Sequence, residues 1–328
     1  NRWRQVSSTI SLTTGELTAN WAYASPAGDA IDDPFEGCLS NGTTYQIDLR
    51  VTDKAGNITA SLEVSSFVWD NEVPAVVIVD PNAVKESVFS GNIRGTATDG
   101  TGGAAPGRIG QFHVRISQNN SGGSPIGWWD TDAQQFRPEA QFNSEQAWFV
   151  PATSDNFANW STAESISSLV SGTGYSVHAK SSDTASNFSG IVRASFTWDS
   201  ERPVSITTTP VNGGFFNAAV WSAIAGTAQD SGNVSCIDRV EVSMRQLGQG
   251  DDLGTNLWWK SLDSNFTQPG AQADTAQLGG ACTSPRDWTF IDIGVEELVS
   301  GTSYFIFAGA RDESGLVEAD FTSGISTF

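Results

Sequence analysis

Apolar and polar residues alternate along short stretches of this chain, which is the pattern of half-buried β-strands. The segment 111–117 alternates in this way, and so do 175–180 and 304–310. Clusters of Gly, Asp, Ser and Pro separate these stretches and predict turns. No segment carries an apolar face at helical spacing for long enough to predict a helix. The chain is therefore predicted to be all-β.

The same pattern returns after about 130 residues, as in tandem repeats. The segment 67–74, Phe-Val-Trp-Asp-Asn-Glu-Val-Pro, returns at 196–203 as Phe-Thr-Trp-Asp-Ser-Glu-Arg-Pro. About seven strands in each complete unit predict a Greek-key β-sandwich of the immunoglobulin kind. Short linkers containing Trp and Pro predict that the sandwiches form an extended rod. The predicted units are 1–69, which is the carboxyl-terminal half of a repeat, 70–198 and 199–328.

Five motifs follow one another in a fixed order, some with substitutions from unit to unit: Trp-Asp-x-x-x-Pro, Ser-Gly-x-x-x-Gly-Thr-Ala-x-Asp, a doubled Trp, Ser-Gly-Thr-x-Tyr and Asp-x-Ala-Gly-Asn. In this order they resemble the tandem bacterial immunoglobulin-like (Big-type) repeats of very long surface and secreted proteins. The resemblance covers essentially the whole chain and departs at 312–316, where Asp-Glu-Ser-Gly-Leu replaces the Asn-containing motif. It implies an extracellular or cell-surface location and a structural or adhesive stalk or fibre segment.

Two other functions stay open at this point. One is a carbohydrate-binding module that uses exposed Trp side chains, and the other is a non-catalytic accessory region of an extracellular hydrolase. The expected partners are neighbouring repeats or copies of the same chain in a fibre or surface layer, with glycans as a further candidate. The half-unit at the amino-terminal end is expected to be completed by upstream residues or by strands of a neighbouring molecule.

The formal net charge is −20, from 37 acidic and 17 basic residues. Such a surface repels phosphate backbones and attracts cations, so we expect no nucleic-acid partner. No apolar run approaches the ~18 residues of a membrane span, so we expect none in this segment.

Carboxylates recur at the turns that a sandwich brings to one pole. Because strands alternate in direction, the turn after the second strand and the turn before the last strand lie beside the incoming linker. Grouped carboxylates repel one another, and Ca²⁺, with roughly six to eight oxygen ligands, relieves that repulsion. The alternative is that each Asp caps its own turn without metal. The predicted calcium ligands are Asp70, Glu72, Asp99 and Asp183 for the second unit, and Asp199, Glu201, Asp230 and Asp312 for the third.

Two Trp doublets, Trp128-Trp129 and Trp258-Trp259, occupy the same place in two repeats. On a strand one ring of each doublet points inward and the other outward. Core and inter-sheet packing is the favoured role, and stacking of an exposed ring on sugar is the alternative.

Catalytic chemistry has little support in the sequence, and we expect no enzyme. The two histidines, His113 and His178, stand in alternating strands, and no metalloprotease, nucleophile-elbow or phosphate-loop motif is present. Cys236 and Cys282 fall in one repeat and could pair, which leaves Cys38 over.

Overall fold

The computed structural model describes residues 39–53, 55–58, 63–82, 85–87, 93–100, 108–162, 166, 168–247, 257–268, 270–319 and 325–328. The part of the first predicted unit that includes Cys38 lies outside these residues. The described chain is all-β, with two short 3-10 turns, η2 (Ser261–Asp263) and η3 (Val295–Glu297). No helix in the described ranges is long and apolar enough to cross a membrane.

The second repeat is a sandwich of two sheets, as the alternating pattern predicts. The smaller sheet has the order β3-β5-β10-β9 and the larger sheet the order β4-β12-β11-β6-β7-β8. Neighbouring strands are antiparallel except β4 and β12, which run parallel. The strands are β3 (Ala75–Asp80), β4 (Lys85–Glu86), β5 (Arg94–Thr98), β6 (Ile109–Asn119), β7 (Pro125–Asp130), β8 (Gln135–Pro138), β9 (Ala152–Thr153), β10 (Trp160–Ser161), β11 (Gly174–Asp183) and β12 (Val192–Trp198).

The third repeat has the same architecture. Its smaller sheet has the order β13-β14-β20-β19, and its larger sheet the order β17-β16-β15-β21-β22, with β18 paired to β15. The strands are β13 (Pro203–Thr209), β14 (Ile224–Asp230), β15 (Ile237–Gln246), β16 (Trp258–Lys260), β17 (Asn265–Gln268), β18 (Asp274–Thr275), β19 (Gln277–Leu278), β20 (Arg286–Phe290), β21 (Tyr304–Asp312) and β22 (Ser326–Thr327).

The described part of the first unit is a two-stranded ribbon of β1 (Thr43–Leu49) and β2 (Glu63–Trp69). Its Tyr45 and Phe67 rings stack at 5.7 Å, as Tyr175 and Phe196 do in the second repeat at 5.5 Å. Ile47 is 47% exposed, whereas Val177 at the same place in the second repeat is fully buried. The ribbon therefore carries an uncovered core face, and its completion by further strands stays a prediction.

A Trp packed over a Gly joins the strands of each smaller sheet. Trp160 of β10 pairs with Gly95 of β5, and Trp288 of β20 pairs with Gly226 of β14. A Cβ on Gly95 would lie 2.4 Å from the Trp160 ring. The Gly-Thr-Ala motif therefore recurs because only glycine leaves room for the buried indole.

The Ser-Gly-Thr-x-Tyr motif also has a structural cause. The hydroxyl oxygen of its Tyr accepts a hydrogen bond from a backbone amide five residues upstream. The Tyr175 bond comes from Val170 at 2.9 Å, and the Tyr304 bond comes from Val299 at 2.7 Å. This is the tyrosine corner of immunoglobulin-like sandwiches, and it fixes the loop before β11 and β21.

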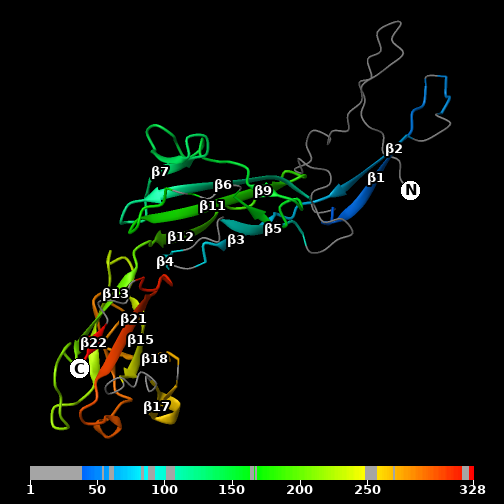
Figure 1. The fold of residues 1–328 in the computed structure, drawn as a ribbon. Coiled ribbons are helices and arrows are strands. Elements are labelled where there is room, and N and C mark those ends of the chain that lie inside the picture. Colours follow the sequence, from blue (N-terminus) through cyan, green and yellow to red (C-terminus); the bar gives the residue numbers. More distant parts are fainter. Residues whose placement is uncertain are drawn as a thin grey trace.

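The two sandwiches lie end to end with a bend at their junction (Figure 1). Only residues 199–202 separate β12 of one repeat from β13 of the next. Across this junction the Ser87 hydroxyl donates to the Ser314 carbonyl oxygen at 2.7 Å. The linker and this contact bring the turns of the third repeat against the end of the second.

Candidate metal centre

Three carboxylates meet where the first unit joins the second repeat. Asp70 follows β2 in the linker, Asp99 follows β5, and Asp183 is the last residue of β11. One oxygen of each lies within 4.8 Å of the others. Asp99 is 6% exposed and Asp183 4% exposed, and Asp70 is half-buried. We call this group the first cluster.

The junction between the second and third repeats repeats the arrangement. Asp199 follows β12, and Asp230 and Asp312 end β14 and β21. Their oxygens again lie within 4.8 Å of one another. The three side chains are more deeply buried here, with at most 1% of each exposed. We call this group the second cluster.

The two glutamates predicted as ligands stand beside these clusters and do not belong to either triad. The Glu72 amide donates to Asp70 Oδ1, and the Glu201 amide donates to Asp199 Oδ1, each at 3.1 Å. The Glu72 carboxylate accepts a 3.0 Å hydrogen bond from Asn41 Nδ2. The backbone amide of each glutamate thus closes a turn of the linker on the preceding Asp, and its carboxylate adds negative charge near the cluster.

Turn capping accounts for only some of the carboxylate oxygens. Both oxygens of Asp183 accept hydrogen bonds from Asn187, at 2.8 and 2.7 Å. Asp230 Oδ2 accepts from the amides of Val234 and Ser235, at 2.6 and 3.1 Å. Within the two clusters, as the structure describes them, four buried oxygens have no hydrogen-bond partner: Asp99 Oδ1 and Oδ2, Asp230 Oδ1 and Asp312 Oδ2.

The charge of these oxygens is also unbalanced. None of the ion pairs in the described part of the chain involves a carboxylate of either cluster. Burial, then Asp183, Asp70 and Glu72, raise the pKa of Asp99 to about 6. Burial raises the pKa of Asp312 as well, with Asp199 and Asp230 adding to it. Buried charges without a partner are strongly unfavourable, and a bound cation would remove that cost.

The donor set suits a hard divalent cation. Carboxylate oxygens supplemented by backbone carbonyls and water are the ligands that Ca²⁺ prefers. Asp70, Asp99 and Asp183 would hold an ion at the first junction, and the second cluster would hold one at the next. The ion would supply charge compensation and tie the linker to two turns of the following sandwich.

Sequence reasoning missed two groups that contact Asp199. The Ser235 hydroxyl donates a short hydrogen bond to Asp199 Oδ2, and the Ser171 hydroxyl donates to Oδ1 at 3.4 Å. Ser171 belongs to the Ser-Gly-Thr-x-Tyr motif, so its recurrence could have indicated a role at the junction. Ser235 has no matching signal in the second repeat.

One ring of each Trp doublet packs inside a sandwich. Trp129 and Trp259 lie in the two cores, with their rings 5.2 Å from Phe136 and 5.3 Å from Phe266. Each doublet thus supplies one ring to a sandwich core, as the strand alternation predicts.

The outward ring of the first doublet is covered. Trp128 is 3% exposed, with the Arg115 guanidinium 4.5 Å above its ring and the His178 ring 5.6 Å away. Trp128 is therefore packed, which agrees with the favoured role, and its ring is not open for the alternative of stacking on sugar. Trp258 is half-buried, and Arg245 lies 5.4 Å from its ring. Burial, then Arg115 and Arg193, lower the pKa of His178 to about 4.

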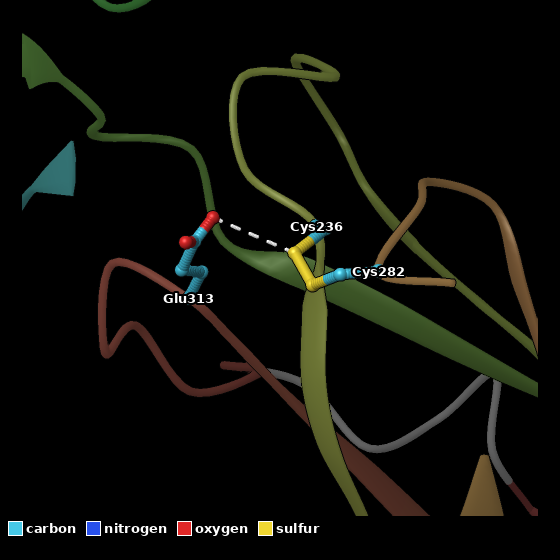
Figure 2. A group of neighbouring side chains, drawn as sticks. All are labelled: Cys236, Cys282 and Glu313. Atoms are coloured by element: carbon cyan, nitrogen blue, oxygen red, sulfur yellow. Dashed lines mark hydrogen bonds between the residues drawn. A yellow bond between two sulfur atoms is a disulfide. The ribbon is translucent and has the colours of Figure 1, made fainter. Parts of the chain in front are cut away.

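Cys236 and Cys282 form a disulfide with a Cα–Cα distance of 5.4 Å (Figure 2). Cys236 Sγ also lies 3.5 Å from Glu313 Oε2. A disulfide sulfur carries no hydrogen to donate and no thiolate charge to bind a metal, so this trio is not a further metal site.

Comparison with known proteins gives only distant likenesses. No family model and no curated protein matches the chain. Fibronectin(III)-like modules of Clostridium thermocellum CbhA share 12% identity over 77% of this chain and 91% of theirs, with a TM-score of 0.32. A 1.5-MDa bacterial ice-binding adhesin shares 13% identity over 88% of this chain and 73% of its own, also with a TM-score of 0.32. Mouse cadherin-23 EC22-24 shares 12% identity over 79% and 64%, with a TM-score of 0.20.

At such TM-scores none of these likenesses carries an argument about function. The sheet orders support the immunoglobulin-like architecture that the sequence resemblance implied. The finer assignment to Big-type repeats stays a prediction.

Proposed function

We propose that this chain is a non-catalytic structural segment of an extracellular stalk or adhesin, in which calcium ions fix consecutive β-sandwiches to one another. The observation that carries the proposal is the set of buried carboxylate oxygens without partners at both junctions. In each cluster one ligand comes from the linker and two come from the next sandwich. A bound ion would therefore restrict rotation between repeats.

The extracellular setting agrees with two further properties. The Cys236–Cys282 disulfide is a bond that forms and persists in oxidising compartments. The net charge of −20 favours cation binding and keeps neighbouring stalks soluble. Adhesion through the repeats, and the bacterial surface protein to which they would belong, are part of this proposal.

Calorimetry of the metal-free chain, with and without Ca²⁺, tests the function. A ligand at a hundredfold excess over its Kd stabilises the folded state by about 2.7 kcal/mol, which is roughly 10 °C in the melting temperature of a repeat of this size. We expect such a rise for both repeats. Equal melting temperatures with Ca²⁺ and with chelator would exclude the metal.

Asp155→Asn is the matched control for Asp183→Asn. Asp155 accepts the same two hydrogen bonds, from the amide and side chain of Asn159 at 2.9 and 2.7 Å, but lies outside both clusters. We expect Asp183→Asn to abolish the calcium effect on the second repeat and Asp155→Asn to leave it intact. Small-angle scattering should show a narrower range of inter-repeat orientations with Ca²⁺.

A further inference from the structure

Cys236 adjoins the residue that connects two carboxylates of the second cluster. Ser235 donates its hydroxyl to Asp199 Oδ2 and its amide to Asp230 Oδ2, the latter at 3.1 Å. The position of Ser235 depends on the short turn between β14 and β15, which Cys236 closes.

The segment that carries the third carboxylate, Asp312, is hydrogen-bonded to Cys236. The carbonyl oxygen of Cys236 accepts a 2.9 Å hydrogen bond from the amide of Glu313, which directly follows Asp312. Cys236 therefore bonds directly to the segment of Asp312, lies in the turn that follows Asp230, and is linked to Asp199 through the adjoining Ser235. Figure 2 shows the disulfide that joins Cys236 to Cys282, with Glu313 beside Cys236.

The segment that follows Cys282 braces the turn from the other side. The Ser284 hydroxyl oxygen accepts from the Asp230 amide at 2.8 Å, and Arg286 Nη1 donates to the Ile237 carbonyl oxygen at 2.8 Å. The disulfide is the covalent part of this brace, because it joins Cys282 to the turn that carries Asp230 and Ser235.

Among the residues that the structure describes, no disulfide lies beside the first cluster. Its Asp99 is followed by a Gly-rich stretch, 100–107, that contains no Cys. Asp183 is held instead by Asn187. One chain thus offers a disulfide-braced cluster and a cluster without a disulfide.

We propose that the Cys236–Cys282 disulfide is a positioning element of the cation site at the second junction, so that cation binding there depends on the oxidised state and binding at the first junction does not. This inference rests on the proposed function. A phosphine reductant breaks the S–S bond, takes the oxygen of a water molecule to become the phosphine oxide, and leaves two thiols. The turn between β14 and β15 then loses its covalent anchor, and Asp230 and Ser235 lose their fixed place.

The test uses the full chain in two forms, each with one cluster removed. Asp99→Asn with Asp183→Asn leaves only the second cluster, and Asp230→Asn with Asp312→Asn leaves only the first. Calorimetric titration with CaCl₂ is carried out before and after treatment with a phosphine. We expect the affinity of the second cluster to fall at least tenfold on reduction and that of the first cluster to change less than twofold.

The same titrations are repeated without reductant on chains that carry Cys236→Ala and Cys282→Ala. Near-ultraviolet circular dichroism reports the packing of the third repeat in the reduced and in the alanine chains. Equal affinity of the second cluster in the oxidised and reduced chains overturns the inference but leaves the proposed function standing. Loss of the third repeat's near-ultraviolet signal in both the reduced and the alanine chains also overturns it, because the bond then supports the whole sandwich. No calcium binding at either junction of the oxidised chain would refute the proposed function itself.

Discussion

Asn187 is bonded across the first junction to Asp70: its side-chain amide donates to the Asp70 carbonyl oxygen at 3.1 Å. The same amide donates to Asp183 Oδ2 at 2.7 Å. One side chain therefore joins the linker to the turn after β11. In the third repeat Leu316 takes the place of Asn187 and bonds to Asp312 through its backbone alone: its amide donates to Asp312 Oδ1 at 2.9 Å, and its carbonyl oxygen accepts from the Asp312 amide at 3.1 Å.

We expect Asn187→Leu to destabilise the second repeat by about 1–3 kcal/mol, because the change removes both side-chain hydrogen bonds and leaves their partly buried acceptors without this donor. Urea denaturation measures the effect. Asn159→Leu is the control, since Asn159 makes the same bond to Asp155 but no bond to a linker. An equal loss in the two variants would mean that the bond to the Asp70 carbonyl oxygen contributes nothing.

The pH dependence of the first junction follows from Asp99. Its pKa of about 6 in the folded chain exceeds its ordinary value of 3.8, so between these values the folded state binds more protons than the unfolded state. In chelator, the contribution of Asp99 to stability therefore falls as pH rises from 3.8 through about 6. Comparing the melting temperatures of the parent chain and Asp99→Asn across this range isolates the effect, and parallel curves would contradict it.

Calcium binding at the first junction should show the opposite trend. Ca²⁺ competes with the Asp99 proton, so affinity should be roughly tenfold lower at pH 5 than at pH 7 and should level off above about pH 7. Titration of the chain that carries only the first cluster measures this. Affinity independent of pH between 5 and 7 would exclude Asp99 as a ligand.

Gly226→Ala should destabilise the third repeat by about 3 kcal/mol or more, because overpacking of this kind strains the sheet. The added Cβ would lie 2.0 Å from the Ile206 carbonyl oxygen and 2.5 Å from the Trp288 ring. Gly190→Ala, whose Cβ would meet nothing within 4 Å, should be nearly neutral. Thermal denaturation of both variants decides the matter, and a neutral Gly226→Ala would show that the sheet can shift to accommodate a methyl group.

Ser186→Gly should stabilise the second repeat by about 0.5–1 kcal/mol, because a non-glycine residue in the left-handed region is strained. Ser186 has a φ of 74°, and its counterparts Gly56 and Gly315 both have a φ of 92°. Gly315→Ser should destabilise the third repeat by a similar amount. Chemical denaturation of both variants gives the two values, and an effect of the same sign in both would contradict the argument.

Trp128→Ala should destabilise the second repeat by about 3–5 kcal/mol, as expected for truncation of a buried Trp. Trp258→Ala should cost less, because Trp258 is only half-buried. Denaturation curves together with a glycan array measure stability and binding separately. Glycan binding by the parent chain that disappears in a fully folded Trp128→Ala variant would restore the sugar-binding role.

The sequence predicts those parts of the fold that depend on alternation and on repeated motifs. Val177 and Ile306 are buried because their strands alternate, and the three Asp residues of each cluster follow from strand direction. Alternation cannot show what covers an outer sheet face, so the cover over Trp128 was missed. Alternation and repeated motifs also cannot identify a side chain that makes a structural hydrogen bond in one repeat but has no counterpart in the other.

Glu318 illustrates the second limit. Its buried carboxylate accepts hydrogen bonds from the amide and hydroxyl of Ser205 and from the amide of Ala310. These contacts join β13 to β21 between residues far apart in the sequence. The second repeat has no glutamate at this place, so comparison of the repeats gave no signal for it.

The brevity of the linkers has a mechanical consequence. Residues 199–202 are the only covalent path between β12 and β13, so any pulling force along the chain passes through Asp199. An ion held by Asp199, Asp230 and Asp312 would distribute that tension to the two turns that follow β14 and β21. Removal of the ion would leave the backbone of 199–202 and a few hydrogen bonds across the junction to carry the load.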